Sequence, residues 1–210
     1  MDQLKAYPTI WVCGLDCGLC PRYFTVGPSR CPGCGGPRFS EKHPSCAFIT
    51  CCGKKRELEV CGQCPEFPCS KFKGEEEYRK LESSSYPPSR SMLSNLRFVK
   101  EEGIEKFVVL QTERIRLLET MIERYDEGRS KSFFCRAAAL LEPTALACSL
   151  VKAKASTGAG RGGSTDNRHR ARVLRTILAE AALCSGIELK AKKAERERAH
   201  LPGAKRREVS

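Results

Sequence analysis

Eleven of the fourteen cysteines in this 210-residue chain lie within residues 13–69, most of them two to four residues apart. Two cysteines separated by two residues can bind one ion together, and two such pairs complete a tetrahedral shell of four sulfurs. Thiolates at similar spacings also hold iron–sulfur clusters. The cysteine pattern therefore predicts a metal-binding module, and it indicates no reaction.

One spacing within this module is typical of zinc ribbons and zinc knuckles. Cys17 and Cys20 form a first pair, and after ten residues Cys31 and Cys34 form a second. The glycines around the second pair let the backbone turn sharply, so that amide groups can approach the sulfurs. We therefore expect a zinc-ribbon-like or knuckle-like module, in which residues 7–12 form a brief strand leading into the first ligands.

The second half of the module contains residues whose roles the sequence leaves open. His43 could be a ligand, although a lone histidine before a proline is more often a turn residue. Cys51 and Cys52 are adjacent and should point in different directions, so we expect only one of them to join a given ion. Residues 54–60 are expected to form one short helical turn between ligands.

Three cysteine motifs together resemble a known family. They are Cys-Gly-Leu-x-Cys-Gly-x-Cys at residues 13–20, Cys-x-Gly-Cys at residues 31–34 and Cys-x-x-Cys-Pro-Glu-Phe-Pro-Cys at residues 61–69. Over roughly residues 8–74, the chain resembles an uncharacterised cysteine-rich domain family of bacteria and archaea, of unknown function, for which metal binding is expected. Cys52 is an extra cysteine beside this pattern. The metal ligands that the resemblance implies are Cys13, Cys17, Cys20, Cys31, Cys34, Cys46, Cys51, Cys61, Cys64 and Cys69.

A module of this size has little apolar core of its own, so the rest of the chain must supply a second folding unit. We expect an α-rich protein in which a small, irregular, metal-stabilised N-terminal module is followed by helical hairpins. The expected divisions are 1–74 for the module, 75–90 for a linker, 91–156 for a helical domain, 157–165 for a flexible linker, 166–190 for a basic helix with a short extended segment, and 191–210 for a disordered basic tail.

Apolar residues recur with the period of a helix from residue 91 onward. The expected helices follow residue 91 and then cover residues 104–125, 132–141, 143–156 and 166–184.

A loop at residues 128–132 could bind a phosphate at the start of a helix, but an ordinary helix cap is the favoured interpretation.

The net charge of +12 is concentrated at the C-terminal end, because residues 151–210 carry +9 of it. Arg168, Arg170, Arg172 and Arg175 all lie on the expected helix 166–184. Such a charge distribution can attract phosphate-rich partners, so nucleic-acid binding through residues 166–210 is an alternative to a merely solvated surface. The apolar side of this helix should dock on the helical domain, because it would otherwise expose a contiguous apolar stripe.

The beginning of the chain lacks the basic start and apolar run of a secretory signal, and no apolar run approaches the roughly 20 residues that span a bilayer. We therefore expect a cytoplasmic protein without membrane contact. In that reducing compartment, clustered cysteines are more often metal ligands than disulfides. The disulfide alternative would require an oxidising compartment.

The sequence favours a metal-binding structural or interaction protein, with zinc as the metal and a protein of unknown identity as the partner. Ten or eleven thiolates exceed what two zinc ions require, so an iron–sulfur redox protein or enzyme with a 4Fe-4S cluster is an alternative. A zinc protein associated with nucleic acid is a second alternative. Hydrolysis is not indicated, because His43, His169 and His200 are scattered and form no constellation with carboxylates.

Overall fold

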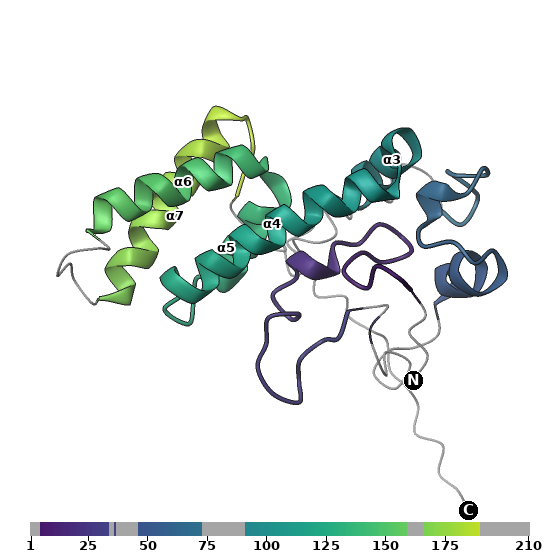
Figure 1. The fold of residues 1–210 in the computed structure, drawn as a ribbon, viewed down its shortest axis with the longest axis horizontal. Helices are drawn as coiled ribbons and strands as arrows, with labels where there is room; N and C mark the ends of the chain where they lie inside the picture. Colours follow the sequence, from purple (N-terminus) through teal and green to yellow (C-terminus); the bar gives the residue numbers. More distant parts are fainter. Residues whose placement is uncertain (1–4, 34–35, 37–45, 73–90, 159–165, 190–210) are drawn as a thin grey trace, which may run out of the picture.

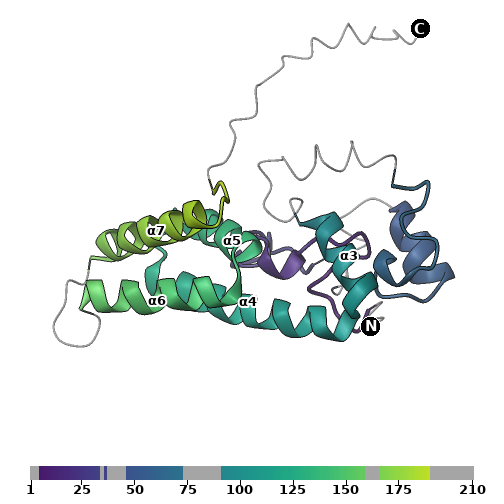
Figure 2. The ribbon, with the colours of Figure 1, turned by 90° about the horizontal axis from the view of Figure 1, so that it is seen from above.

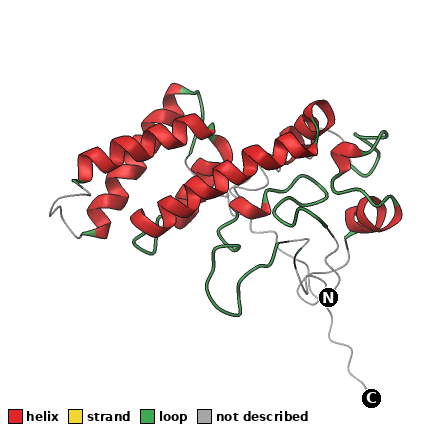
Figure 3. Ribbon diagram, in the orientation of Figure 1, coloured by secondary structure: helices red, strands yellow, loops and turns green. Residues whose placement is uncertain are grey.

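The computed structural model describes residues 5–33, 36, 46–72, 91–158 and 166–189. Cys34, His43, the expected linker at 75–90 and the tail at 191–210 lie outside these ranges. The described residues form an α-rich fold in which short helical turns of the cysteine-rich region precede longer helices, as the sequence predicts (Figures 1 and 3). The elements are η1 (Cys17–Leu19), η2 (Ile49–Lys55), η3 (Cys61–Gln63), α3 (Met92–Glu102), α4 (Ile104–Tyr125), α5 (Lys131–Leu140), α6 (Pro143–Thr157) and α7 (Asn167–Cys184).

The start of the module folds back on itself and does not form the strand expected at residues 7–12. Ile10 and Asp16 make a single antiparallel bridge, and Gly14 turns the chain between them with a φ of 85°. The amide of Gly14 donates a hydrogen bond to the carbonyl of Trp11 at 2.8 Å. In the described residues the pairing of the two arms is confined to this one bridge. The described ranges contain no β-strand, so the strand pairing of a zinc ribbon is not seen in them.

A π-helix, η2, occurs in place of the helical turn that we expected at residues 54–60. It begins at Ile49 and ends at Lys55, so it precedes most of the expected turn and carries both Cys51 and Cys52. The chain then leaves this helix through Glu57, whose φ is 54°. π-helices are rare and frequently occur at functional sites.

Gly103 separates α3 from α4. Glycine adopts its φ of 92° without strain. The Gly103 amide donates a hydrogen bond to the carbonyl of Val99 at 3.0 Å, which is the last hydrogen bond of α3. The 22 residues of α4 give it a length of about 33 Å. Its buried side chains recur at helical spacing, as the sequence predicts, and include Ile104, Phe107, Gln111, Leu118, Met121 and Tyr125.

The loop before α5 is an ordinary helix cap. The Asp126 carboxylate accepts hydrogen bonds from the amides of Ser130 and Lys131, both at 3.0 Å. Because these amides already have an acceptor, the loop does not offer them to a phosphate. The structure therefore agrees with the favoured interpretation of residues 128–132.

The last two helices, α6 and α7, pack side by side (Figure 2). Pro143 occupies the first turn of α6, where its missing amide hydrogen is not needed. The Asp166 side chain caps α7 by accepting from the amide of Arg168 at 2.9 Å. One face of α7 is buried against the other helices, as expected, through Ala171, Leu174, Leu178 and Ala182.

The buried apolar side chains form two cores. In the first core, Trp11 and Val60 of the module pack with Leu96 of α3 and Phe107 of α4. The second core joins the later part of α4 to α5, α6 and α7, and it also takes in Leu19 of η1. Thus α3 packs with the module, although the sequence assigned it to the helical domain, and α4 takes part in both cores. None of the described helices combines the length and apolar character that crossing a bilayer requires.

Candidate metal centre

The loop at residues 13–17, which carries Cys13 and Cys17 and is called the first ligand loop below, packs tightly against α3 and α4. A β-carbon on Gly14 would lie 2.3 Å from the carbonyl oxygen of Met92. Only glycine therefore fits at the point where the loop meets α3. The buried Asp16 carboxylate accepts hydrogen bonds from the side-chain amides of Asn95, at 3.2 Å, and Gln111. Burial raises the pKa of Asp16, and these two donors oppose the rise.

Cys17 and Cys46 lie close enough to Cys13 to affect its ionisation. Cys13 and Cys17 are buried, and Cys46 is half-buried. Burial, together with the charges of Cys17 and Cys46, raises the pKa of Cys13 to about 12. The Cys13 thiol is therefore protonated at neutral pH, and a metal ion must displace that proton to bind its sulfur.

Cys20 is buried beside the second core. It follows Leu19, which belongs to that core. Burial raises the pKa of Cys135 on α5 to about 12, and a charge on Cys20 adds to this rise. Cys135 itself is fully buried among apolar side chains, in agreement with its assignment from sequence as a core residue.

The predicted pair at residues 31 and 34 is only half described. Cys31 is half-buried, and its amide donates to the carbonyl of Arg22 at 3.0 Å. The turn after it lies against the first ligand loop, because a β-carbon on Gly33 would be 3.7 Å from the β-carbon of Cys17. Cys34 lies outside the described residues, so a site shared by the two pairs stays a prediction.

In the second half of the module, five cysteines line one cavity of about 240 Å³. Four of them are predicted ligands, and the fifth, Cys52, is the extra cysteine beside the family pattern. Three phenylalanine side chains form the apolar part of the wall. The five thiols are those of Cys51, Cys52, Cys61, Cys64 and Cys69, and the aromatic residues are Phe48, Phe67 and Phe72.

The sulfurs of Cys52 and Cys61 are joined by a hydrogen bond. This interaction lowers the pKa of Cys52 and raises that of Cys61. Cys52 is only 2% exposed. The sequence did not predict Cys52 as a ligand, because spacing rules treat the second of two adjacent cysteines as surplus and because no sequence pattern predicts a π-helix.

Arg56 brings positive charge to the sulfurs of this cavity. One terminal nitrogen of its guanidinium donates to the Cys64 sulfur at 3.3 Å, and the other donates to the Glu66 carboxylate at 2.6 Å. Lys71 also lines the cavity. A cation that donates to sulfur favours the thiolate, which is the form that binds metals.

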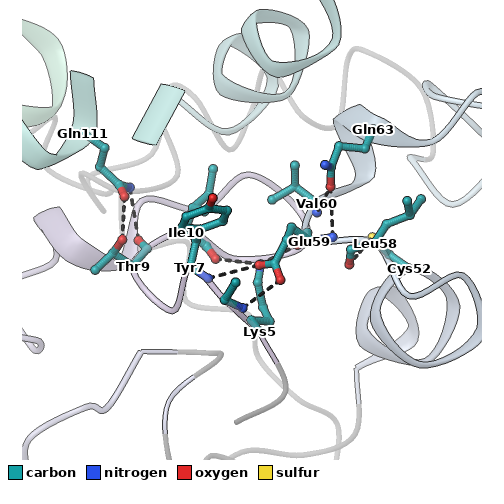
Figure 4. A network of polar contacts seen from close by, with 11 residues as sticks. Lys5, Tyr7, Thr9, Ile10, Cys52, Leu58, Glu59, Val60, Gln63 and Gln111 are labelled. Carbon is teal, nitrogen blue, oxygen red and sulfur yellow. Dashed lines mark hydrogen bonds and ion pairs between the residues drawn. The ribbon is translucent and has the colours of Figure 1, made fainter. Parts of the chain in front are cut away.

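A polar network ties the first described residues to the segment before η3 (Figure 4). The Lys5 ammonium is buried and donates to the carbonyls of Ile10, at 2.9 Å, and Glu59. In return, the Glu59 carboxylate accepts from the amides of Ala6 and Tyr7, at 2.7 and 3.2 Å. Burial lowers the pKa of Lys5, while the nearby Glu59 opposes the fall.

Two glutamines extend this network at its two ends (Figure 4). The Gln63 side-chain oxygen accepts from the amides of Glu59 and Val60, at 2.9 and 3.2 Å. Gln111 of α4 accepts from the Thr9 hydroxyl at 2.6 Å. Cys61 of η3 is therefore positioned by the beginning of the chain, through its amide hydrogen bond to the carbonyl of Val12, and by the packing of η3 on α3.

Across the described ranges the cysteines are thiols, without disulfides. No group of three or more Cys, His, Asp or Glu side chains in these ranges is arranged so that it could hold a metal ion. The five sulfurs thus share a cavity without closing around a common point.

Residues 9–74 match a family model described as a protein of unknown function, DUF3795. The matched range covers all ten predicted ligands and Cys52, and it confirms the resemblance seen in the cysteine motifs. The family description names neither a metal nor a reaction. No curated protein and no solved structure matches the chain.

Proposed function

We propose that the cysteine-rich module binds zinc and that the protein is a metal-stabilised structural or interaction protein. The observation that carries this proposal is the convergence of five cysteines on one cavity of about 240 Å³. Structural zinc sites take four ligands, commonly thiolates, in a tetrahedron. Cys61, Cys64 and Cys69 would supply three sulfurs, and Cys51 or Cys52 the fourth.

The closeness of Cys52 and Cys61 supports a metal at this place. Both side chains line the same cavity and interact with each other, and metals compete with protons for such thiols. The thiols must still move inward, because their present arrangement does not surround a point. The cavity provides the room for that movement.

Charges around the cavity also favour this chemistry. A zinc ion with four thiolates carries a net charge of −2, which is costly to hold beside apolar side chains without compensation. Arg56 and Lys71 lie at the cavity wall and offset part of this charge, although Arg56 is also paired with Glu66 at 2.6 Å. The N–H···S hydrogen bond from Arg56 also reduces the charge on the Cys64 sulfur.

Cys13, Cys17 and Cys46 are the candidates for a second ion. Cys13 and Cys17 lie in the first half of the module and Cys46 in the second, and the charges of Cys17 and Cys46 act on Cys13. Cys31 precedes the turn at Gly33 that approaches Cys17, and Cys34 is the next residue in the sequence. Because these sites need reduced thiols, the proposal places the protein in the cytoplasm.

Elemental analysis of the anaerobically purified full-length chain tests the proposal. We expect about two zinc ions per chain, at four thiolates per ion. The double variant Cys61→Ser with Cys64→Ser should bind about one ion fewer. The matched control, Cys148→Ser with Cys184→Ser, removes two exposed thiols outside the module and should leave the zinc content unchanged.

Two results would overturn the proposal. A chain without metal, whose cysteines are oxidised in the anaerobic preparation, would show that the module is held by disulfides. Iron together with acid-labile sulfide and a visible absorption spectrum would replace zinc with an iron–sulfur cluster.

A further inference from the structure

We propose that a groove between α5 and α7 binds single-stranded nucleic acid through its phosphates. The groove has a volume of about 1050 Å³ and lies beside the second core, and no cysteine lines it. The outcome of the metal experiments therefore has no bearing on this inference. Four arginines line the groove, namely Arg136, Arg168, Arg172 and Arg175.

Three of these arginines form a stripe along α7. Arg168, Arg172 and Arg175 are spaced four and three residues apart, which places them on one face of the helix. They are exposed, and they span about 10 Å along the helix axis. The adjoining face of α7 is buried in the second core, so the helix is held in place beside the stripe while the three arginines stay exposed. Arg170 is not part of the stripe, because its guanidinium lies over the Tyr125 ring at 5.2 Å.

Arg136 adds a fourth positive charge from α5. Its guanidinium donates to the carbonyl of Leu189 at 2.6 Å, which fixes the segment after α7 as part of the groove wall. Only two acidic residues, Glu127 and Glu188, are among the residues that line the groove. The lining therefore carries an excess of positive charge, and a polyanion complements it.

The groove also offers surfaces on which bases can stack. The Arg175 guanidinium lies over the Phe133 ring at 5.1 Å, and its outer plane faces away from that ring. Leu183 is 75% exposed and lines the same groove. Stacking on arginine planes and aromatic rings, combined with a basic groove that follows the backbone, is how proteins bind single strands without reading sequence.

A single strand fits these features better than a duplex does. The arginines line a concave groove, which one extended backbone can enter together with its unpaired bases. In a duplex, the bases are stacked inside and mainly phosphates reach the protein, so the outer plane of Arg175 and the exposed Leu183 would have no base to contact. Arginine also suits phosphate better than lysine does, because its planar fork can donate two parallel hydrogen bonds.

Fluorescence anisotropy with a labelled 12-nucleotide single strand of uridines or thymidines tests the proposal on the full-length chain. The double variant Arg168→Gln with Arg172→Gln should weaken binding by about tenfold and reduce the salt slope by about 1.4, at about 0.7 for each lost phosphate contact. The matched control, Lys152→Gln with Lys154→Gln, removes two exposed charges from α6 and should change the affinity by less than about twofold. Neither pair has a hydrogen-bonded side chain that the fold depends on.

Competition experiments identify the ligand class. We expect the single strand to compete better than a hairpin duplex of equal length, a mononucleotide or poly-glutamate. No binding, or equal weakening by the two double variants, would overturn the groove as the site. Equal or stronger competition by the duplex, by the mononucleotide or by poly-glutamate would overturn a single strand as its ligand.

Discussion

Gly14 is constrained both by its backbone conformation and by its close contact with α3, and two mutations can separate these effects. Its φ of 85° favours glycine, and a β-carbon there would lie 2.3 Å from the Met92 carbonyl oxygen. Gly27 has a similar φ of 91°, but a β-carbon there would meet nothing within 4 Å. We expect Gly27→Ala to lower the free energy of unfolding by about 1–2 kcal/mol through backbone strain alone. Gly14→Ala should lose about 1–3 kcal/mol more, because the loop must move away from α3.

Urea unfolding of the two glycine variants measures this difference. The comparison is internal, because the strain is common to both positions and only the contact with α3 differs. Equal losses in the two variants would mean that the ligand loop can retreat from α3 without cost.

The burial of Cys135 has a consequence at alkaline pH. Its pKa is raised to about 12, whereas a thiol in the unfolded chain titrates near about 8.5. Between these values the folded state keeps a proton that the unfolded state loses, so the stabilising contribution is complete below about pH 8.5 and falls as the pH rises. We expect the stability difference between the wild type and Cys135→Ala to shift by up to about 2.5 kcal/mol, against the wild type, between pH 8 and pH 10.5.

Urea titrations at the two pH values check this shift. The control is Cys148→Ala, which removes an exposed thiol from α6 and should keep the same difference from the wild type at both pH values. A pH-independent difference for Cys135→Ala would contradict the raised pKa.

At the scale of elements, α7 depends on the residue that caps its start, Asp166. Asp166 accepts a hydrogen bond from the amide of Arg168 at 2.9 Å, and removing such a cap typically costs about 1 kcal/mol. We expect Asp166→Ala to lower the free energy of unfolding by about that amount, and Asp166→Ser to retain most of it. Thermal unfolding of both variants measures the effect, with Asn167→Ala as the neighbouring control. A loss at Asn167 as large as that at Asp166 would argue against capping as the cause.

The long helices could be predicted from the sequence because each one buries a stripe of its own residues. The buried positions of α4 recur every three or four residues, and Pro143 and Asp166 mark the starts of α6 and α7. The short elements of the module carry no such pattern. Their shape depends on partners far away in sequence, such as the hydrogen bond from the amide of Cys61 to the carbonyl of Val12 at 2.8 Å.

The same distinction holds for the two candidate sites. The family resemblance predicted four cysteines of the cavity, but it could not show that the η2 helix also brings Cys52 to it. Spacing likewise predicted basic residues on one helix, but Arg136 joins them from α5 and Arg170 turns away toward Tyr125. Local periodicity identifies which residues share a face, and only tertiary packing decides what lies opposite that face.

At the scale of the whole molecule, α4 links the two cores. Its first turns pack with the module and α3, and its later turns pack with α5, α6 and α7 (Figures 1 and 2). If the module holds zinc, a chelator should loosen the first core. We expect amide hydrogen exchange to accelerate in residues 46–72 and in α3, while α5, α6 and α7 keep their protection.

Hydrogen exchange followed by mass spectrometry, with and without chelator, measures this response. The chelator should leave the exchange of the Cys61→Ser, Cys64→Ser double variant nearly unchanged in residues 46–72, because that site is already lost. Retained protection in α3 would show that it can stay folded on α4 alone. Loss of protection throughout the chain would show that the two cores unfold as one unit.

The position of Trp11 gives the protein an optical reporter of its own. It is the single tryptophan of the chain, it is 3% exposed within the first core, and the Lys5 ammonium lies 5.8 Å from its ring centroid. Tryptophan emission shifts to longer wavelength when the indole meets water, so selective excitation follows the opening of the module without any attached dye. A red shift without a large loss of the helical circular dichroism signal would show that the first core opens before the second core unfolds.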